Sequence, residues 1–247
     1  MASVSKRIPK TDEVGLRAAF QETKSYLISN LNYGFSQEEL RISASYALSH
    51  KTISEIGGRI IEEYVSNLLE SSLYQKKSFK LVPTASRSLG DFVVEFKSKE
   101  SYRFYFDVKA QHLSIREKTG EHYKNMKIQA KKPGESHPNL IAYHKAKDFF
   151  SDASRSKEDI AFLMIHYDPS IIGNEVSFNL RALSDSSIFL LRDISESNLS
   201  FGNLGKGQLQ LKRINELRIE NRTRNNFITL IEKLANGPRK TRASGRN

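Results

Sequence analysis

The chain has 247 residues, enough for one large domain or two small ones, and no internal segment has the composition of a linker. Its 39 Lys and Arg residues outnumber 28 Asp and Glu residues, and the net charge of +11 indicates a polyanionic partner. No apolar run approaches the roughly 18 residues that span a bilayer, and the first residues do not resemble a signal peptide. The absence of cysteine excludes disulfides and thiolate zinc sites. We expect a cytoplasmic protein whose partner is nucleic acid rather than a membrane.

Helices are expected in the N-terminal part of the chain, residues 1–50, and directly after it. Apolar residues recur at helical spacing over 12–31, and SQEEL at 36–40 has the capping-box pattern that opens a helix. A further helix is predicted over about 52–71, where isoleucine, tyrosine, valine and leucine residues form one apolar arc.

Three strands are predicted after these helices, at about 78–83, 91–96 and 102–109. The second and third strands alternate apolar and polar residues, and residues 97–101 between them have the length and polarity of a hairpin loop. In such a hairpin Phe96 faces Tyr102 across the ladder. Counting along both strands from that pair, Asp91 faces Asp107.

The opposition of Asp91 and Asp107 has a chemical consequence. Opposed side chains on one face lie about 5 Å apart, and two like charges there are destabilising unless a cation or a proton lies between them. Carboxylate oxygens suit Mg²⁺, which is typically held by one or two carboxylates with water and phosphate. Lys109 shares the face of Asp107 and could orient or activate a water beside the metal. The alternative is a half-buried strand with a solvated polar face.

The remainder of the chain completes a mixed α/β pattern. Residues 110–139 are polar and basic, buried strands are predicted at 160–167 and 186–193, and NNFITLIEKLANGP near the C-terminus has helical periodicity before a Gly-Pro stop. The last residues, 238–247, form a basic tail expected to be flexible. The predicted fold class is therefore mixed α/β, with a central mixed β-sheet flanked by helices.

The pattern D-x(15)-D-V-K, with Gly90-Asp91 in place of Pro-Asp, resembles the active-site signature of the PD-(D/E)xK nucleases. Within that superfamily the chain is most similar to the EcoRV-type restriction enzymes, whose order is a helix with a glutamate, an Asp strand and an Asp-x-Lys strand. The resemblance implies a restriction-endonuclease-like core in which Asp91 and Asp107 bind Mg²⁺. It also implies that Lys109 is catalytic and that the products carry 5′-phosphates.

A glutamate of the helix over 52–71 is the further acid that this resemblance implies. Glu55 and Glu62, seven residues apart, fall together at the flank of the apolar arc. Glu55 is favoured because, as in the EcoRV-type helix, an apolar residue and later an Ile-Ile pair follow it. Glu55 could instead complete a capping box with Thr52, and Glu62 could be a solvated helix residue.

Contacts with DNA are predicted at two kinds of site. A glycine-rich segment at 200–213 resembles the loop with which the EcoRV-type enzymes reach the major groove, although it could instead be a simple hairpin turn. Its candidate base-reading residues are Asn203, Lys206, Gln208 and Gln210. Phosphate contacts are expected from a basic cluster comprising Arg222, Arg224, Lys124, Lys127, Lys131 and Lys132.

These features predict a type II restriction endonuclease that makes Mg²⁺-dependent cuts in both strands of DNA at a short palindromic sequence. A homodimer is expected because one chain offers one D…D-x-K site, with residues 1–50 as the interface since they have apolar stripes of their own. The chain is predicted to form one nuclease domain over residues 1–237. Within it, the catalytic core is expected over 51–195 and the DNA-reading segment over 196–237. A cognate DNA methyltransferase is the expected companion in the host. The alternatives are another nuclease of the superfamily, for repair, recombination or phage use, and a non-catalytic DNA-binding module.

Overall fold

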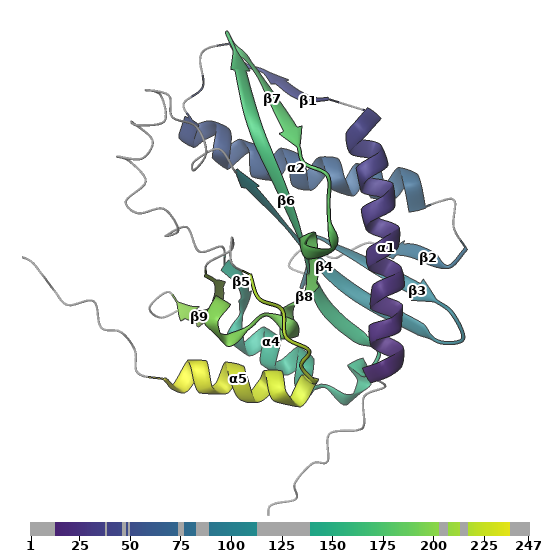
Figure 1. Ribbon diagram of the computed structural model, residues 1–247. Coiled ribbons are helices and arrows are strands. Elements are labelled where there is room, and N and C mark those ends of the chain that lie inside the picture. Colours follow the sequence, from purple (N-terminus) through teal and green to yellow (C-terminus); the bar gives the residue numbers. More distant parts are fainter. Residues whose placement is uncertain are drawn as a thin grey trace, which may run out of the picture.

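The computed structural model describes residues 13–37, 39–45, 48, 50–73, 77–82, 89–112, 139–202, 207–212 and 217–237 (Figure 1). The described helices are α1 (Glu13–Gln37), α2 (His50–Leu73), α4 (Tyr143–Ser151) and α5 (Arg224–Asn236). The strands are β1 (Leu40–Ser43), β2 (Phe79–Val82), β3 (Phe92–Lys97), β4 (Ser101–His112), β5 (Asn139–Ala142), β6 (Glu158–Ile172), β7 (Glu175–Leu180), β8 (Ile188–Leu190), β9 (Leu199–Gly202) and β10 (Gln208–Leu211).

A mixed sheet forms the centre of the fold. Its strand order is β1-β7-β6-β4-β3-β2, and β8 pairs with β6 beside this path. β4 and β6 pair in parallel, whereas the other pairs in the described part of this sheet are antiparallel. A parallel pair requires a crossover connection, and α4 lies in the segment that links β4 to β6. The predicted mixed α/β class, a central sheet flanked by helices, is confirmed.

Helices α1 and α2 cover one face of this sheet (Figure 1). Leu16 and Leu27 of α1 and Val65 of α2 belong to one buried cluster with Phe104 and Phe106 of β4. The apolar stripe of α1 is therefore used inside the chain. The assignment of a dimer interface to residues 1–50 stays a prediction, but the buried part of the α1 stripe is not available to a partner.

The other face of the sheet carries a second buried cluster. Phe162 of β6 packs there with Phe149 of α4, Phe227 of α5 and Leu209 of β10. The smaller three-stranded sheet, with the order β5-β10-β9, belongs to this layer and lies beside α4 and α5 at the lower end of the molecule in Figure 1. The central sheet is thus enclosed on both faces over part of its length, and residues on both sides of position 195 build the second cluster.

Two local predictions are wrong and one needs adjustment. The SQEEL pattern at 36–40 does not open a helix, because α1 continues to Gln37 and β1 already begins at Leu40. The strand predicted at 186–193 shrinks to β8, with short 3-10 turns on either side. The hairpin loop is shorter than predicted, since Lys97 and Ser101 are themselves paired. The helices over 12–31 and 52–71 and the strands over 91–96, 102–109 and 160–167 are confirmed.

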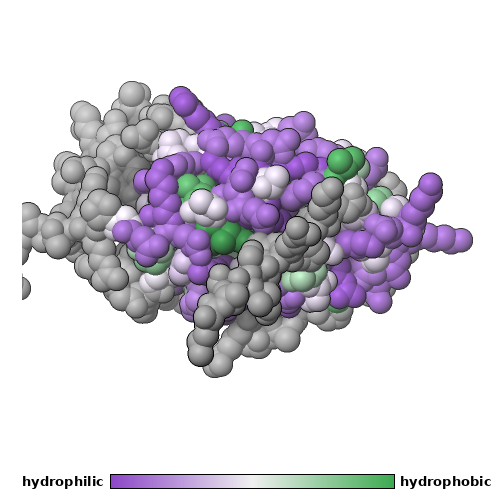
Figure 2. Space-filling model, turned by 90° about the horizontal axis from the view of Figure 1, so that it is seen from below, coloured by the Kyte–Doolittle hydropathy of each residue, from purple (hydrophilic) through white to green (hydrophobic). Residues whose placement is uncertain are grey.

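The surface is largely hydrophilic where it can be followed. Figure 2, which views the molecule from below, shows mostly hydrophilic residues with a few hydrophobic ones among them. Across the described residues, no helix is both long enough and apolar enough to cross a membrane.

Candidate functional site

Asp91 lies directly before β3 and is fixed against the backbone of β4. Its backbone N–H donates to the carbonyl oxygen of Phe106 at 2.7 Å, and its Oδ2 accepts a hydrogen bond from the N–H of Val108 at 2.6 Å. The predicted register is confirmed, because Phe96 pairs with Tyr102 and the ladder continues to the pair of Phe92 and Phe106. One step beyond that last pair, Asp91 reaches the level of Asp107.

Gly90 explains how Asp91 can approach β4 so closely. A Cβ atom at position 90 would lie 2.5 Å from the carbonyl oxygen of Phe106 and 3.0 Å from its nitrogen. Separations this short are forbidden to a carbon atom against backbone, and the strand cannot move aside without breaking its ladder. The residue before the aspartate must therefore be glycine.

Asp107 and Lys109 lie in the middle of β4 on the same face. Lys109 Nζ is 2.7 Å from Asp107 Oδ1, and the two side chains are 23% and 13% exposed. Burial raises the pKa of Asp107 from 3.8 to about 7, the Lys109 ammonium opposes that rise, and the charge of Asp91 and a hydrogen bond with it add to it. The predicted opposition of the two carboxylates is thus present.

The glutamate of α2 that lies near these residues is Glu62. Burial raises its pKa, Asp91 adds to the increase, and Lys109 and Arg59 oppose it, so its carboxylate lies within electrostatic reach of the strand residues. The side chain of Glu55, which the sequence favoured, lies outside the described side chains. Ile61 and Val65 bury the adjacent face of α2 in the sheet-covering cluster, and this packing brings Glu62 to the edge of the site.

Two of the predicted base-reading residues can be placed and two cannot. Gln208 and Gln210 lie on β10, half-buried, opposite Gly202 and Ser200 of β9. Asn203 and Lys206 lie outside the described residues, as do Lys124, Lys127, Lys131 and Lys132 of the predicted phosphate-binding cluster. The base-reading role of Gln208 and Gln210 stays a prediction.

The prediction that Arg222 and Arg224 grip phosphate is wrong. Arg224 is 3% exposed and lies against the ring of Phe149, with 5.6 Å between its guanidinium carbon and the ring centroid. Arg222 donates to the carbonyl oxygen of Ile194 and pairs with Glu220. Both guanidinium groups are engaged within the fold. Their task is to hold the start of α5 against the sheet rather than to meet a ligand.

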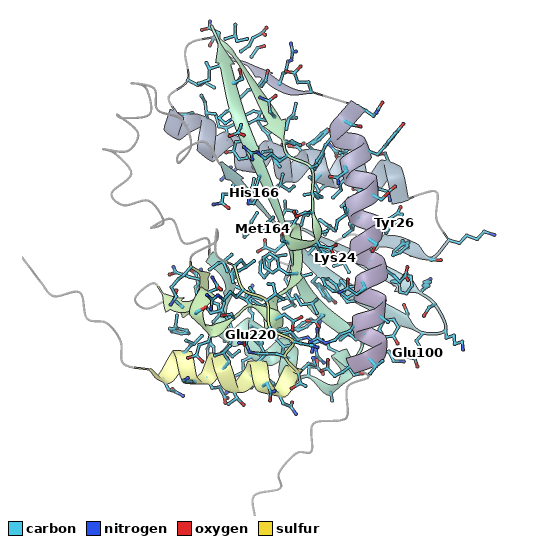
Figure 3. The ribbon with its side chains drawn as sticks, in the orientation of Figure 1. Lys24, Tyr26, Glu100, Met164, His166 and Glu220 are labelled. Carbon is cyan, nitrogen blue, oxygen red and sulfur yellow. The ribbon has the colours of Figure 1, made fainter. Side chains whose placement is uncertain are left out.

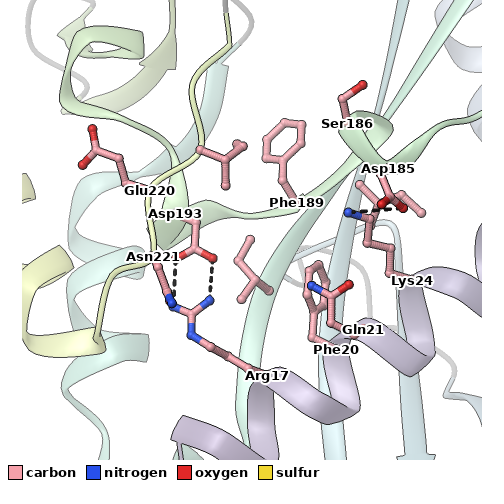
Figure 4. A pocket seen from close by; sticks show the side chains of 13 residues that line it. Arg17, Phe20, Gln21, Lys24, Asp185, Ser186, Phe189, Asp193, Glu220 and Asn221 are labelled. Atoms are coloured by element: carbon pink, nitrogen blue, oxygen red, sulfur yellow. Dashed lines mark hydrogen bonds and ion pairs between the residues drawn. The ribbon is translucent and has the colours of Figure 1, made fainter.

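A pocket of about 500 Å³ opens between α1 and the segment around β8 (Figure 4). Four of its charged side chains are engaged with one another: Arg17 forms two hydrogen bonds with Asp193, of 2.8 and 3.0 Å, and Lys24 lies 3.7 Å from Asp185. The fifth, Glu220, pairs with Arg222. The pocket is not lined by Asp91, Asp107, Lys109 or Glu62. The pocket therefore contributes no group to the carboxylate site on β3 and β4.

The residues that the structure does bring together are Asp91, Asp107, Lys109 and Glu62. No group of three or more His, Asp or Glu side chains in the described part of the chain has metal-binding geometry. Two carboxylates are nevertheless the number that Mg²⁺ commonly takes from a protein, the rest being water and phosphate, so the donor set of Asp91 and Asp107 fits this ion. A comparison of the chain with models of known protein families found no match, and neither did one with curated proteins.

Proposed function

We propose that the chain is a Mg²⁺-dependent endodeoxyribonuclease of the PD-(D/E)xK kind that cuts double-stranded DNA as a cytoplasmic type II restriction enzyme. One observation carries the proposal: the carboxylates of Asp91 and Asp107 meet beside Lys109 on one face of the sheet. The helix acid Glu62 lies near them. The order of elements, an acidic helix, an Asp strand and an Asp-x-Lys strand, is that of the EcoRV-type enzymes, which the chain resembles.

A purely structural role for these residues does not explain why Asp91 and Asp107 oppose each other. A buried carboxylate whose pKa is raised to about 7 destabilises the folded chain at neutral pH. A divalent cation between Asp91 and Asp107 removes that penalty, because it neutralises both carboxylates and displaces the shared proton. The non-catalytic alternative gives the opposition no purpose.

When bound, Mg²⁺ supplies polarisation of the scissile phosphate and a lowered pKa for an attacking water. Asp91 and Asp107 would hold the ion against the sheet, Asp91 being fixed by its hydrogen bond from Val108. Lys109 is placed to stabilise negative charge on the water or on the pentavalent phosphate. Glu62, with its raised pKa, can accept a proton or orient the water. The products would be 5′-phosphate and 3′-hydroxyl ends.

Cutting both strands in one encounter requires two such sites, so the proposal includes a homodimer and a palindromic target. The segment 200–213 is retained as the proposed base-reading element, and Gln208 and Gln210 are its candidate residues that lie on β10. Sedimentation of the protein with and without cognate DNA tests this assembly. A monomer in both states would leave the nuclease chemistry standing but remove the two-site mechanism.

The nuclease chemistry is tested by incubating plasmid with the purified protein in Mg²⁺ or in EDTA and separating the products. Discrete bands in Mg²⁺ alone support a restriction enzyme, a smear supports another nuclease of the superfamily, and no cutting contradicts the proposal. Asp107→Ala should abolish cutting, whereas Asp148→Ala, at an exposed carboxylate of α4, should not change it.

The identity of the helix acid is tested by a pair of neighbouring variants. Glu62→Gln should lower the cleavage rate by about 100-fold or more, a size typical for the loss of a catalytic proton carrier. Glu63→Gln is the matched control, because Glu63 is the next residue of α2 and is exposed. Equal activity of both variants would exclude Glu62 from the site.

A further inference from the structure

Three polar residues form a row across the sheet beyond the candidate site: Gln111 of β4, His166 of β6 and Arg181, which follows β7. Gln111 and His166 are partners in the parallel ladder. The backbone N–H of Arg181 donates to the carbonyl oxygen of His166 at 2.9 Å, which extends the pairing of β6 and β7 by one residue. Figure 3 labels His166 and Met164, which both lie on the long β6 strand.

The row lies on the same face as Asp107 and Lys109. Side chains two residues apart on a strand share a face, so Asp107, Lys109 and Gln111 point the same way. The step from Lys109 to Gln111 is about 7 Å along the strand. Successive phosphates along one nucleic-acid strand are separated by a similar distance. A nucleic-acid strand that had its scissile phosphate at Lys109 and ran along β4 would bring a neighbouring phosphate to Gln111.

Two atoms of the row lack the hydrogen bonds that burial normally demands. Within the described part of the chain, Gln111 Oε1 and His166 Nε2 are buried and have no hydrogen-bond partner. Such groups destabilise a fold and are uncommon in native proteins. Here two of them fall on adjacent strands at paired positions. The same condition occurs at Nη2 of Arg192 and Nε of Arg224, but those guanidinium groups are otherwise bonded inside the fold, whereas the atoms of Gln111 and His166 lie at paired positions on the face of the candidate site.

The third member of the row supplies charge. Arg181 has a side chain that is 52% exposed and lies 3.0 Å from Asp168, so its guanidinium can exchange a solvated ion pair for a phosphate. Burial lowers the pKa of His166, the Arg181 guanidinium lowers it further and Asp168 opposes them. His166 is therefore a neutral imidazole at neutral pH and can present an N–H group to a ligand oxygen.

We propose that Gln111, His166 and Arg181 form a second phosphodiester-binding point of the candidate site, one strand step beyond Lys109, which holds the nucleic-acid strand that is to be cut. This inference rests on the proposed nuclease function. Arg181 contributes the charge-assisted contact. His166 and Gln111, both half-buried, contribute neutral N–H donors, the amide of Gln111 by rotation about its last side-chain bond.

The test measures binding of a short fluorescent duplex of mixed sequence in EDTA, where no cutting occurs, at several salt concentrations. Arg181→Ala should weaken binding about tenfold and reduce the slope of log K against log salt by about 1, as expected for one lost phosphate contact. Arg103→Ala is the matched control: Arg103 is 48% exposed, is ion-paired with Glu95 and lies at the opposite end of the same face of β4. It should leave the slope unchanged.

The variants His166→Phe and Gln111→Leu separate a binding role from a structural one. Each variant removes a buried atom that makes no hydrogen bond in the free protein, Oε1 of Gln111 or Nε2 of His166, and should weaken binding severalfold with little change in the thermal unfolding midpoint. A loss of thermal stability with unchanged binding would overturn the inference.

Two further outcomes distinguish this inference from the proposed function. Suppose that the wild-type protein cuts plasmid and that all three variants bind DNA with the wild-type affinity and salt slope. The phosphate-binding role of Gln111, His166 and Arg181 is then refuted, and the proposed nuclease function is retained. If the wild-type protein neither binds the duplex nor cuts plasmid, both are refuted.

Discussion

Replacing Asp107 with asparagine tests whether the candidate site is built at a cost in stability. The pKa of Asp107 is about 7 in the folded protein against an ordinary value of 3.8, chiefly because of burial. Between these values the folded chain keeps a proton that the unfolded chain has released. The wild type is therefore stabilised by this group below about pH 4, and that contribution is lost as the pH rises through about 7. A shift of this size corresponds to about 4 kcal/mol.

The side chain of Asp107 is 13% exposed, so solvent screening reduces this figure only in part. The pKa of about 7 already includes the opposing effect of the Lys109 ammonium at 2.7 Å, so the loss of that ion pair in the asparagine variant is not subtracted a second time. We expect Asp107→Asn to be more stable than the wild type by about 2–4 kcal/mol near pH 8 and to be nearly equal to it near pH 4.

The assay is urea unfolding in EDTA at a series of pH values, with Asp148→Asn as the control at an exposed carboxylate. Adding Mg²⁺ near pH 8 should stabilise the wild type and leave Asp107→Asn unaffected, because the ion binds only the folded, ionised pair. A variant that is no more stable than the wild type near pH 8, with a difference that does not change with pH, would refute the reasoning.

Two other substitutions examine the supports of the site and of the fold. Gly90→Ala should destabilise the protein by about 1–3 kcal/mol in urea unfolding and abolish cleavage. The reason is that the new Cβ would meet the carbonyl oxygen of Phe106 at 2.5 Å and displace Asp91. Full cleavage activity of this variant would contradict the prediction. Arg192→Met should lower the free energy of unfolding by about 3–5 kcal/mol. Asp159 is fully buried, its carboxylate lies 2.7 Å from Arg192 Nε, and the variant removes that cation. A loss below about 1 kcal/mol would show that the ion pair is dispensable.

The hairpin of the candidate site could be predicted from the sequence because its determinants are local. Alternation of apolar and polar residues sets the face of each side chain, and the short polar connection sets the register that pairs Phe96 with Tyr102. From that single pair the neighbouring positions of Asp91 and Asp107 follow by counting. The loop is two residues shorter than the predicted segment 97–101, because Lys97 and Ser101 pair with each other. Each strand gains one residue, so the register is unchanged.

Features that depend on tertiary packing could not be predicted from the sequence. Glu55 and Glu62 have similar places in the helical pattern, and only the docking of α2 on the sheet brings Glu62 within electrostatic reach of Asp91. The preference for Glu55 stays a prediction, because its side chain lies outside the described ones. Arg222 and Arg224 are basic residues at or just before the start of α5, and in the sequence they cannot be distinguished from surface residues. Their burial depends on groups far away in the chain, such as the carbonyl oxygen of Phe149, 75 residues from Arg224.

The place of the site on the sheet follows from where the second cluster ends. On this face of β6, Phe162 and Met164 belong to that cluster, whereas His166, two residues further on, is only partly buried. The parallel register sets Asp107 beside Phe162 and Lys109 beside Met164. The acid therefore lies where the cover of α4 and α5 gives way, buried enough for its pKa to rise and near enough to the open part of the sheet for a ligand to reach. Moving the D-x-K motif two residues towards the start of β4 would place the aspartate at position 105, beside the buried Ile160 and against the ring of Phe149, where the cover of α4 would enclose it.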